Sequence, residues 1–240
     1  MEWLRRLQHS RVGHGVSDVL VRKYYFHWQI REEWPRQEFF ASAFKALVFN
    51  GISGDYAEFG SCSGTTFFFA YREAKRHGYP AHLWAFDSFQ GLPPPQPGDR
   101  HPRWIEGKMA TSEEGFHAIC RKRGIPREQY DLVPGFYEES LGTMAPNDPP
   151  ADIALAYIDC DFYSSTKSVL AFLEPRLKHG MIVAFDDYFC WSADDVSGER
   201  KALLELQARS GRWTWTPYVQ YGWYGMSFVL EDGTRAQCVA

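Results

Sequence analysis

The feature that most constrains the fold of this chain is a series of acidic residues, each placed at or near the end of a short apolar run. The acids are Glu58, Asp87, Asp159, Asp161, Asp186 and Asp187, and the apolar runs include residues 83–86, 153–158 and 181–185. Short continuous apolar runs are typical of buried parallel strands. Ligands bind outside the carboxyl ends of the strands in open α/β sheets, so these carboxylates are expected to meet in one crevice. Such a crevice would suit a cofactor that contains a nucleoside, together with a divalent metal ion.

Strand-like and helix-like patterns alternate along most of the chain. We expect strands at residues 55–59, 82–86, 130–133, 152–159 and 180–185, and helices at residues 65–77, 112–123, 164–177 and 198–210. Two later runs, 213–218 and 223–230, are expected to form an antiparallel pair around Gly222. The alternation predicts a mostly parallel, doubly wound α/β sheet of the Rossmann-like type, with helices on both faces and the hairpin at one edge.

The organisation predicted for the 240 residues is one large domain with an addition at its start. Residues 1–50 are expected to form an N-terminal helical extension or lid, and residues 51–240 the α/β domain. Residues 88–111 are too rich in proline and glycine for regular structure and are expected to form a functional loop.

Bulk properties exclude several classes of protein. The net charge of −4 provides no basic surface for a nucleic-acid partner. Neither an apolar leader nor a run of roughly 18 apolar residues occurs, so we expect a cytoplasmic protein without membrane attachment. The five cysteines form no C-x-x-C pair and are expected to be reduced.

The turn after the first expected strand reads E-x-G-x-x-x-G, with Glu58, Gly60 and Gly64. Glycines at a strand-to-helix turn let the backbone approach a ligand closely. A carboxylate there would repel a pyrophosphate but would attract the ammonium and sulfonium groups of S-adenosylmethionine. Asp87 ends the second strand, where Rossmann-like sheets place an acid for ribose hydroxyls. An ordinary glycine turn with a surface acid, and a solvated aspartate at a strand end, remain the alternatives.

A second group of acids consists of Asp159, Asp186 and Asp187. If their two strands are neighbours, the three carboxylates lie within reach of one ion, and Mg²⁺ prefers such oxygen ligands. Three uncompensated carboxylates in one crevice would be costly, which favours a bound cation. The alternative is a set of helix caps and turn acids, and Asp161, close before an expected helix, fits that description.

Five segments in order resemble the macrocin O-methyltransferase family of Mg²⁺-dependent S-adenosylmethionine O-methyltransferases. They read GDYAEFG at 54–60, AFDSFQGLP at 85–93, GFYEESL at 135–141, YIDCDFYSST at 157–166 and GMIVAFDDY at 180–188. The resemblance covers about two-thirds of the chain. Its most specific strings are the D-S-F-x-G-L-P and D-x-D-x-Y-x-S-T segments.

The resemblance implies a class I methyltransferase fold, O-methyl transfer and a set of site residues. Glu58 and Gly60 would hold the methionine part of the cofactor, and Asp87 the ribose. The other cofactor-binding residues would be Ser61, Gly64, Ser88, Phe89, Ser112, Phe136 and Asp159. Asp159, Asp186 and Asp187 would bind Mg²⁺, which chelates two vicinal oxygens of a small-molecule acceptor. Asp159 would also be catalytic and take the acceptor proton. The acceptor would be a sugar or another natural product, and the protein a homo-oligomer.

Two departures from the family pattern leave alternatives open. Residues 61–66 read SCSGTT where the family more often has a bulky Arg-Gly-Gly turn, and the first 50 residues do not align. Asp159 and Asp161 also form a D-x-D, the pair with which metal-dependent glycosyltransferases hold a nucleotide sugar. A non-catalytic cofactor-binding protein with the same fold is the other alternative.

Overall fold

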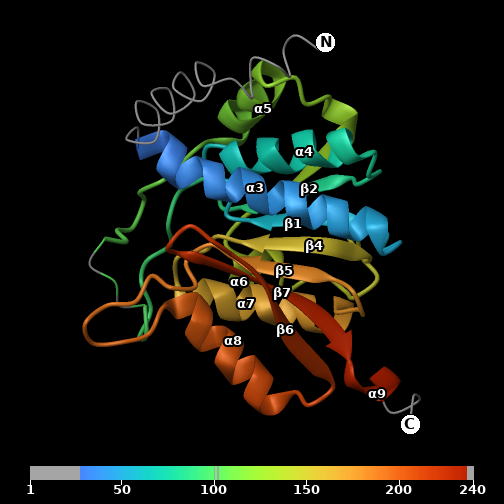
Figure 1. Ribbon diagram of the computed structural model, residues 1–240. Coiled ribbons are helices and arrows are strands. Elements are labelled where there is room, and N and C mark those ends of the chain that lie inside the picture. Colours follow the sequence, from blue (N-terminus) through green and yellow to red (C-terminus); the bar gives the residue numbers. More distant parts are fainter. Residues whose placement is uncertain (1–27, 100, 102, 237–240) are drawn as a thin grey trace, which may run out of the picture.

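The computed structural model describes residues 28–99, 101 and 103–236. The first 27 residues of the expected N-terminal extension lie outside this range. Figure 1 shows the described chain as one sheet with helices packed on it.

The centre of the molecule is a seven-stranded sheet with the order β3-β2-β1-β4-β5-β7-β6. Its strands are β1 (Asp55–Phe59), β2 (Leu83–Asp87), β3 (Tyr130–Pro134), β4 (Ile153–Ile158), β5 (Ile182–Phe185), β6 (Trp213–Tyr221) and β7 (Gly225–Asp232). Strands β1 to β5 pair in parallel, whereas β7 pairs antiparallel with both β5 and β6. The mostly parallel Rossmann-like sheet predicted from the sequence is therefore confirmed, including its edge hairpin.

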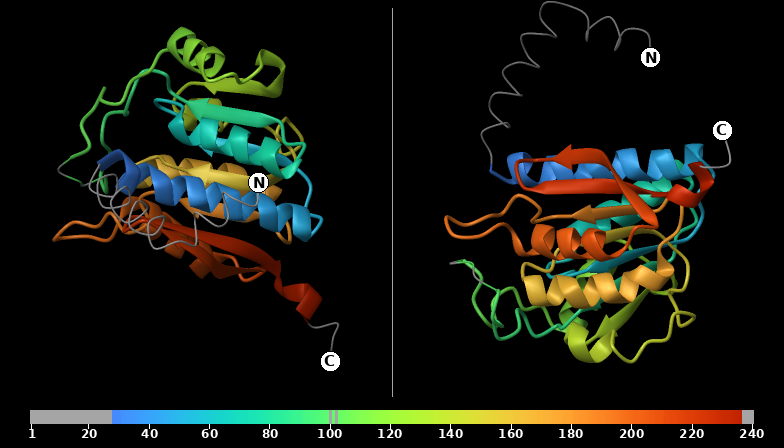
Figure 2. Two further views of the ribbon diagram at one scale, coloured as in Figure 1. Left: turned by 45° about the horizontal axis from the view of Figure 1, so that its top comes forward. Right: turned by 90° about the horizontal axis from the view of Figure 1, so that it is seen from below.

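Helices cover both faces of this sheet (Figures 1 and 2). They are α3 (Trp28–Phe49), α4 (Thr65–His77), α5 (Glu113–Lys122), α6 (Tyr137–Ser140), α7 (Tyr163–Leu173), α8 (Gly198–Arg209) and α9 (Gly233–Ala236), with 3₁₀ turns η1 (Arg127–Gln129) and η2 (Glu174–Arg176). One apolar cluster packs α3, α4 and α5 on the sheet, and a second packs α6, α7 and α8. The strands between them are buried on both sides, which explains why they read as continuous apolar runs.

Most element boundaries differ slightly from those expected, and the largest differences are in helix α7 and in the edge hairpin. Helix α7 ends at Leu173, four residues early, and continues as the 3₁₀ turn η2. Pro175 lies in that turn, and its missing N–H removes a helical hydrogen bond. Strand β6 runs three residues further than expected, to Tyr221, and β7 begins and ends two residues later than expected. Pairing of Tyr221 with Gly225 extends the hairpin up to the turn that contains Gly222.

The second half of the expected N-terminal extension is helix α3. Its side chains Phe39, Phe40 and Phe44 are fully buried, and Phe40 contacts the rings of Tyr56 and Tyr157 on the central strands. Helix α3 therefore forms part of the core cover. A functional boundary at residue 50 remains a prediction. Within the described ranges, no helix combines the length and apolar character needed to span a membrane.

The ends of the parallel strands are held level by backbone hydrogen bonds. The N–H of Gly60 donates to Phe86 O, and the N–H of Asp159 donates to Phe59 O, both at 2.8 Å. The N–H of Asp186 donates to Ile158 O at the same distance. These bonds align the carboxyl ends of the strands, so the acids at the ends of β2, β4 and β5 lie on the same side of the sheet, as the sequence predicted.

Candidate functional site

A pocket opens at the carboxyl ends of β1, β2, β3 and β4. Its lining comprises Gly60, Cys62, Asp87, Ser88, Gly91, Leu92, Pro93, Met109, Gly135, Phe136, Tyr137, Glu138, Asp159, Cys160, Asp161 and Ser165. Five of the cofactor-binding residues predicted from the sequence are among them: Gly60, Asp87, Ser88, Phe136 and Asp159. The topology thus brings residues almost a hundred positions apart around one cavity, at the place where α/β sheets bind ligands.

The floor of the pocket is the turn between β1 and α4. Gly60 has φ of +94°, and a Cβ added to it would lie 1.9 Å from Asp159 O. Only glycine allows this approach of two strand ends. The neighbouring Ser61 hydroxyl is buried, and no described residue forms a hydrogen bond with it. The close approach of backbone at Gly60, which lines the pocket, fits a polar ligand such as the methionine part of S-adenosylmethionine.

Asp87 links the turn after β1 to the segment after β2 by hydrogen bonds. Its Oδ2 accepts a hydrogen bond from the N–H of Cys62 at 2.9 Å, and its Oδ1 accepts one from the N–H of Phe89 at 2.7 Å. Burial raises the pKa of this carboxyl group, while the backbone donors act in the opposite direction. Each carboxylate oxygen can accept a second hydrogen bond. Asp87 is thus rigidly placed and retains acceptor capacity toward a ribose.

Several predicted cofactor residues do not line the pocket. Phe89 packs its ring 5.7 Å from that of Phe116, and a Cβ on Gly64 would lie 3.3 Å from Phe116 as well. Ser112 caps α5 by accepting a hydrogen bond from the N–H of Gly115. The pocket lining includes none of these predicted residues, nor Ser61. Their direct contact with a cofactor stays a prediction.

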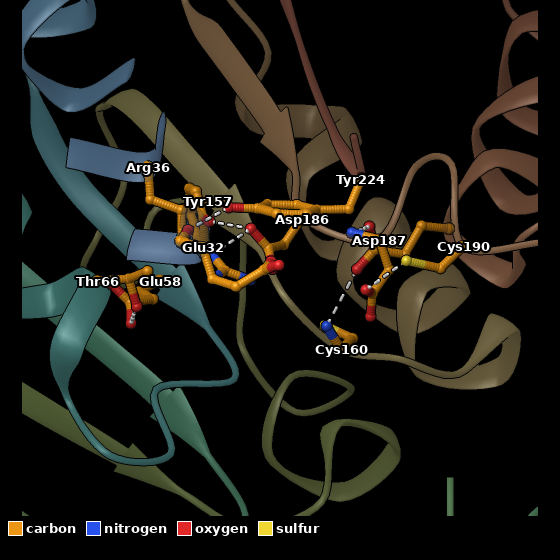
Figure 3. A network of polar contacts seen from close by, with 11 residues as sticks. Glu32, Arg36, Glu58, Thr66, Tyr157, Cys160, Asp186, Asp187, Cys190 and Tyr224 are labelled. Carbon is orange, nitrogen blue, oxygen red and sulfur yellow. Dashed lines mark hydrogen bonds and ion pairs between the residues drawn. The ribbon is translucent and has the colours of Figure 1, made fainter. Parts of the chain in front are cut away.

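Glu58 is also outside the lining, in the middle of β1, with its side chain fully buried. Its carboxyl group accepts a hydrogen bond from the hydroxyl of Tyr56. It also accepts one from the hydroxyl of Thr66 at 2.8 Å (Figure 3). Burial raises the pKa of Glu58 to about 8. Because Thr66 lies in the first turn of α4, its hydrogen bond with Glu58 links that turn to β1. Glu58 is therefore placed to stabilise the glycine turn between β1 and α4.

Replacement of Glu58 by glutamine should flatten the dependence of stability on pH. Between pH 4.5 and about 8, folded Glu58 keeps a proton that the unfolded chain releases. Stability is therefore full below pH 4.5 and is lost as the pH rises through 8, by up to about 1.4 kcal/mol per pH unit. The glutamine amide mimics the neutral acid and does not titrate. Urea denaturation of Glu58→Gln and wild type from pH 5 to 9 measures the difference, and parallel curves would contradict it.

A cluster of acids adjoins the pocket at the ends of β4 and β5. Burial, with the charges of Asp186 and Asp187, raises the pKa of Asp159 well above its ordinary value. Asp161, at φ of +61°, is hydrogen-bonded to Asp187, and burial raises the pKa values of both, that of Asp187 to about 6. The cluster therefore carries closely spaced carboxyl groups that disfavour one another's charged forms.

Asp186 faces a different partner. Both of its oxygens are engaged by the guanidinium of Arg36, from α3, and Oδ1 also accepts a hydrogen bond from the Tyr157 hydroxyl (Figure 3). Arg36 was not predicted, because no family motif was recognised in the first 50 residues, although the family match described below begins at residue 35. Arg36 compensates part of the negative charge for which the sequence argument invoked a metal ion.

Glu199 is a second functional residue that sequence reasoning missed. It is fully buried, and its two oxygens accept hydrogen bonds from the N–H groups of Cys160 at 3.1 Å and Asp187 at 2.8 Å. It therefore joins the two acid-bearing segments. Glu199 lies in the first turn of α8, where an acid is ordinary, so the pattern alone gives no hint of this role.

The donor set partly fits the predicted magnesium ion. Asp161 is buried and Asp159 and Asp187 are partly exposed, and all three offer carboxylate oxygens, which Mg²⁺ prefers. Asp186 is committed to Arg36, and across the described ranges no group of three or more histidine, cysteine, aspartate or glutamate side chains is arranged to hold a metal ion. The carboxylate chemistry of the cluster suits a divalent cation, and for Asp186 such an ion would compete with Arg36.

The expected functional loop forms one side of the pocket through Leu92, Pro93 and Met109. Its two ends are joined by hydrogen bonds from the N–H of Leu92 to Lys108 O and from the N–H of Gly107 to Leu92 O, both at 2.9 Å. The loop is therefore closed at its base and lies beside the ligand cavity, consistent with the role expected for it.

Comparison with known proteins relates this geometry to a family. A model of the family described as macrocin O-methyltransferase matches residues 35–202. A curated relative is 8-demethyl-8-(2,3-dimethoxy-alpha-L-rhamnosyl)-tetracenomycin-C 4'-O-methyltransferase from Streptomyces olivaceus, which is 31% identical over 174 residues. That alignment covers 70% of this chain, and the chain spans 63% of the relative's length.

Solved structures share the fold at lower identity. The O-methyltransferase NovP superposes with a TM-score of 0.67 at 22% identity, over 84% of this chain and 87% of NovP. The O-methyltransferase TomG from Streptomyces achromogenes, solved in complex with SAM, gives a TM-score of 0.54 at 13% identity over 80% and 79% of the two chains. With the family model covering most of the described α/β sheet, this chain belongs to the macrocin O-methyltransferase family.

Proposed function

We propose that this protein is an S-adenosylmethionine-dependent, Mg²⁺-dependent O-methyltransferase that acts on a hydroxyl of a sugar or other natural-product acceptor with vicinal oxygens. The observation that carries the proposal is the convergence of Gly60, Asp87 and Asp159 on one pocket, next to the acidic cluster. A cofactor pocket and a cation-attracting cluster are the two parts that metal-assisted methyl transfer requires.

The cofactor would lie across the carboxyl ends of the strands, with its ribose at Asp87 and its methionine part at the Gly60 turn. S-adenosylmethionine carries no phosphate, which agrees with a pocket whose charged groups are carboxylates. Bound there, it would supply an electrophilic methyl group. The chain would contribute alignment, because Asp87 and the glycine turn are held rigidly by backbone hydrogen bonds.

The acceptor would approach from the side of the acidic cluster, with Asp159 between the two ligands. Asp159, Asp186 and Asp187 would hold the magnesium ion, which would lower the pKa of a coordinated acceptor hydroxyl. Asp159 would also take the hydroxyl proton, since its carboxylate lines the pocket next to the acidic cluster. A sugar acceptor is supported by the rhamnosyl group in the name of the Streptomyces olivaceus relative. Homo-oligomeric state and cytoplasmic location stay predictions from the sequence.

Calorimetric titration with S-adenosylhomocysteine tests the cofactor site. Wild-type protein should bind it, and Asp87→Asn should weaken binding about 10- to 100-fold, since a hydrogen bond to a charged group contributes about 1.5–3 kcal/mol. Asp131→Asn, which removes a half-exposed carboxylate on β3, is the matched control and should bind normally. Thermal denaturation of both variants separates lost binding from lost folding. A wild-type protein that binds a nucleotide sugar and not S-adenosylhomocysteine would overturn the proposal.

A further inference from the structure

The contact that the proposed function leaves unexplained is the ion pair between Arg36 and Asp186. Nε of Arg36 donates to Oδ1 of Asp186 at 2.9 Å, and Nη2 donates to Oδ2 (Figure 3). The Asp186 side chain is only 2% exposed. A two-point pair of this kind uses both oxygens of the carboxylate in a fixed geometry. A metal ion that binds Asp186 would therefore have to compete with Arg36 for the same two oxygens.

Arg36 is itself held by groups that do not belong to the acidic cluster. Its guanidinium carbon lies 4.3 Å from the centroid of the Tyr224 ring, and Nη1 donates to Glu32 O at 3.2 Å. The Tyr224 hydroxyl also donates to Glu32 O. Arg36 thus lies between α3 and the turn that joins β6 to β7, where its stem and its stacked ring face can remain when its partner changes.

The Arg36–Asp186 ion pair compensates negative charge in the acidic cluster. Asp159, Asp161, Asp186, Asp187 and Glu199 gather at the ends of β4 and β5. Arg36 is the one lysine or arginine in the described chain that forms an ion pair with any of them. Without Arg36 or a cation, buried carboxylates of like charge would face one another uncompensated. A cation at the cluster and the guanidinium serve the same electrostatic need.

We propose that Arg36 and a divalent cation are alternative partners of Asp186, so that Arg36 compensates the charge of Asp186 in the metal-free protein and is displaced when the ion binds. This inference rests on the proposed magnesium dependence and adds a residue of α3 that sets the affinity for the ion. Arg36 is a positioning residue, since it acts on the metal site through Asp186. Displacement costs the Arg36–Asp186 pair, and removal of Arg36 abolishes that cost.

The test is a calorimetric titration of Mg²⁺ into wild type and Arg36→Met, which keeps the apolar stem and removes the charge. The variant should bind Mg²⁺ at least about tenfold more tightly, as expected when a charge-assisted pair no longer has to be broken. Its melting temperature in EDTA should fall below that of wild type, and Mg²⁺ should raise it by more. Arg212→Met is the matched control, because it breaks an arginine–aspartate pair with Asp232 at the opposite edge of the sheet and should leave Mg²⁺ affinity unchanged.

Two results would overturn the inference in distinguishable ways. Equal or weaker Mg²⁺ binding by Arg36→Met would show that Arg36 does not compete, while the magnesium site itself would stand. Absence of Mg²⁺ binding by wild type and variant alike would remove the proposed metal dependence together with the inference. If Arg36→Met does not fold, Arg36→Lys decides. It keeps the charge without the two-point fork, and should bind Mg²⁺ more tightly than wild type.

Discussion

Gly60→Ala is expected to lower the free energy of unfolding by at least about 3 kcal/mol and to abolish binding of S-adenosylhomocysteine. The new Cβ would lie 1.9 Å from Asp159 O, which belongs to backbone and cannot rotate away. The positive φ of Gly60 adds a further cost of about 1–2 kcal/mol for any other residue. Strand ends β1 and β4 would have to separate, and the pocket between them would lose its floor. Thermal denaturation should show a fall of roughly 6–12 °C in the melting temperature.

Gly51→Ala is the matched control for this prediction. Gly51 also has a positive φ, +65°, but a Cβ there would meet nothing within 4 Å. It should therefore lose only about 1 kcal/mol for the backbone conformation and keep its ligand affinity. Equal effects of the two variants would show that backbone strain, and not the approach of Gly60 to Asp159, limits this turn.

Asp159→Asn is expected to lower the turnover number for methyl transfer by about 10³-fold while leaving the protein at least as stable as wild type. Asparagine retains the size of the side chain but cannot accept the hydroxyl proton and is a poor ligand for a hard cation. Removal of one carboxylate from the cluster also relieves repulsion by Asp186 and Asp187, so stability should rise. Loss of activity with gain of stability is the signature of a functional residue.

The measurement is transfer of a labelled methyl group from S-adenosylmethionine to a rhamnoside with vicinal hydroxyls, beside denaturation curves of each variant. Asp131→Asn, the surface carboxylate on β3, should change neither quantity by much. Asp159→Asn should still bind S-adenosylhomocysteine, because Gly60 and Asp87 remain. Activity near the wild-type level would exclude Asp159 as the base and leave the neighbouring Asp161 and Asp187 as candidates.

The sequence predicted correctly those pocket residues that lie at the carboxyl end of a strand. Gly60, Asp87 and Asp159 all stand at strand ends, and the pocket contains each of them. Glu58 shows the limit of that reasoning. It stands in the same motif as Gly60, but Gly60 follows the end of β1, whereas Glu58 lies within the strand and its buried carboxyl group accepts hydrogen bonds from Tyr56 and Thr66. Motif membership locates a segment, and side-chain direction decides what each member contacts.

Local sequence patterns were sufficient to predict the parallel sheet, its edge hairpin and the gathering of the acids at the carboxyl ends of the strands. Apolar runs, glycine turns and the alternation of strands with helices can all be read from short stretches of sequence. Only the tertiary structure identified the residues that interact with those acids. Arg36 reaches Asp186 across 150 positions, and Glu199 joins the segments of Cys160 and Asp187 from a different helix. Such pairings depend on how separate elements pack, and no local pattern encodes them. The electrostatics of the acidic cluster, and with them the affinity for a cation, are set at that level.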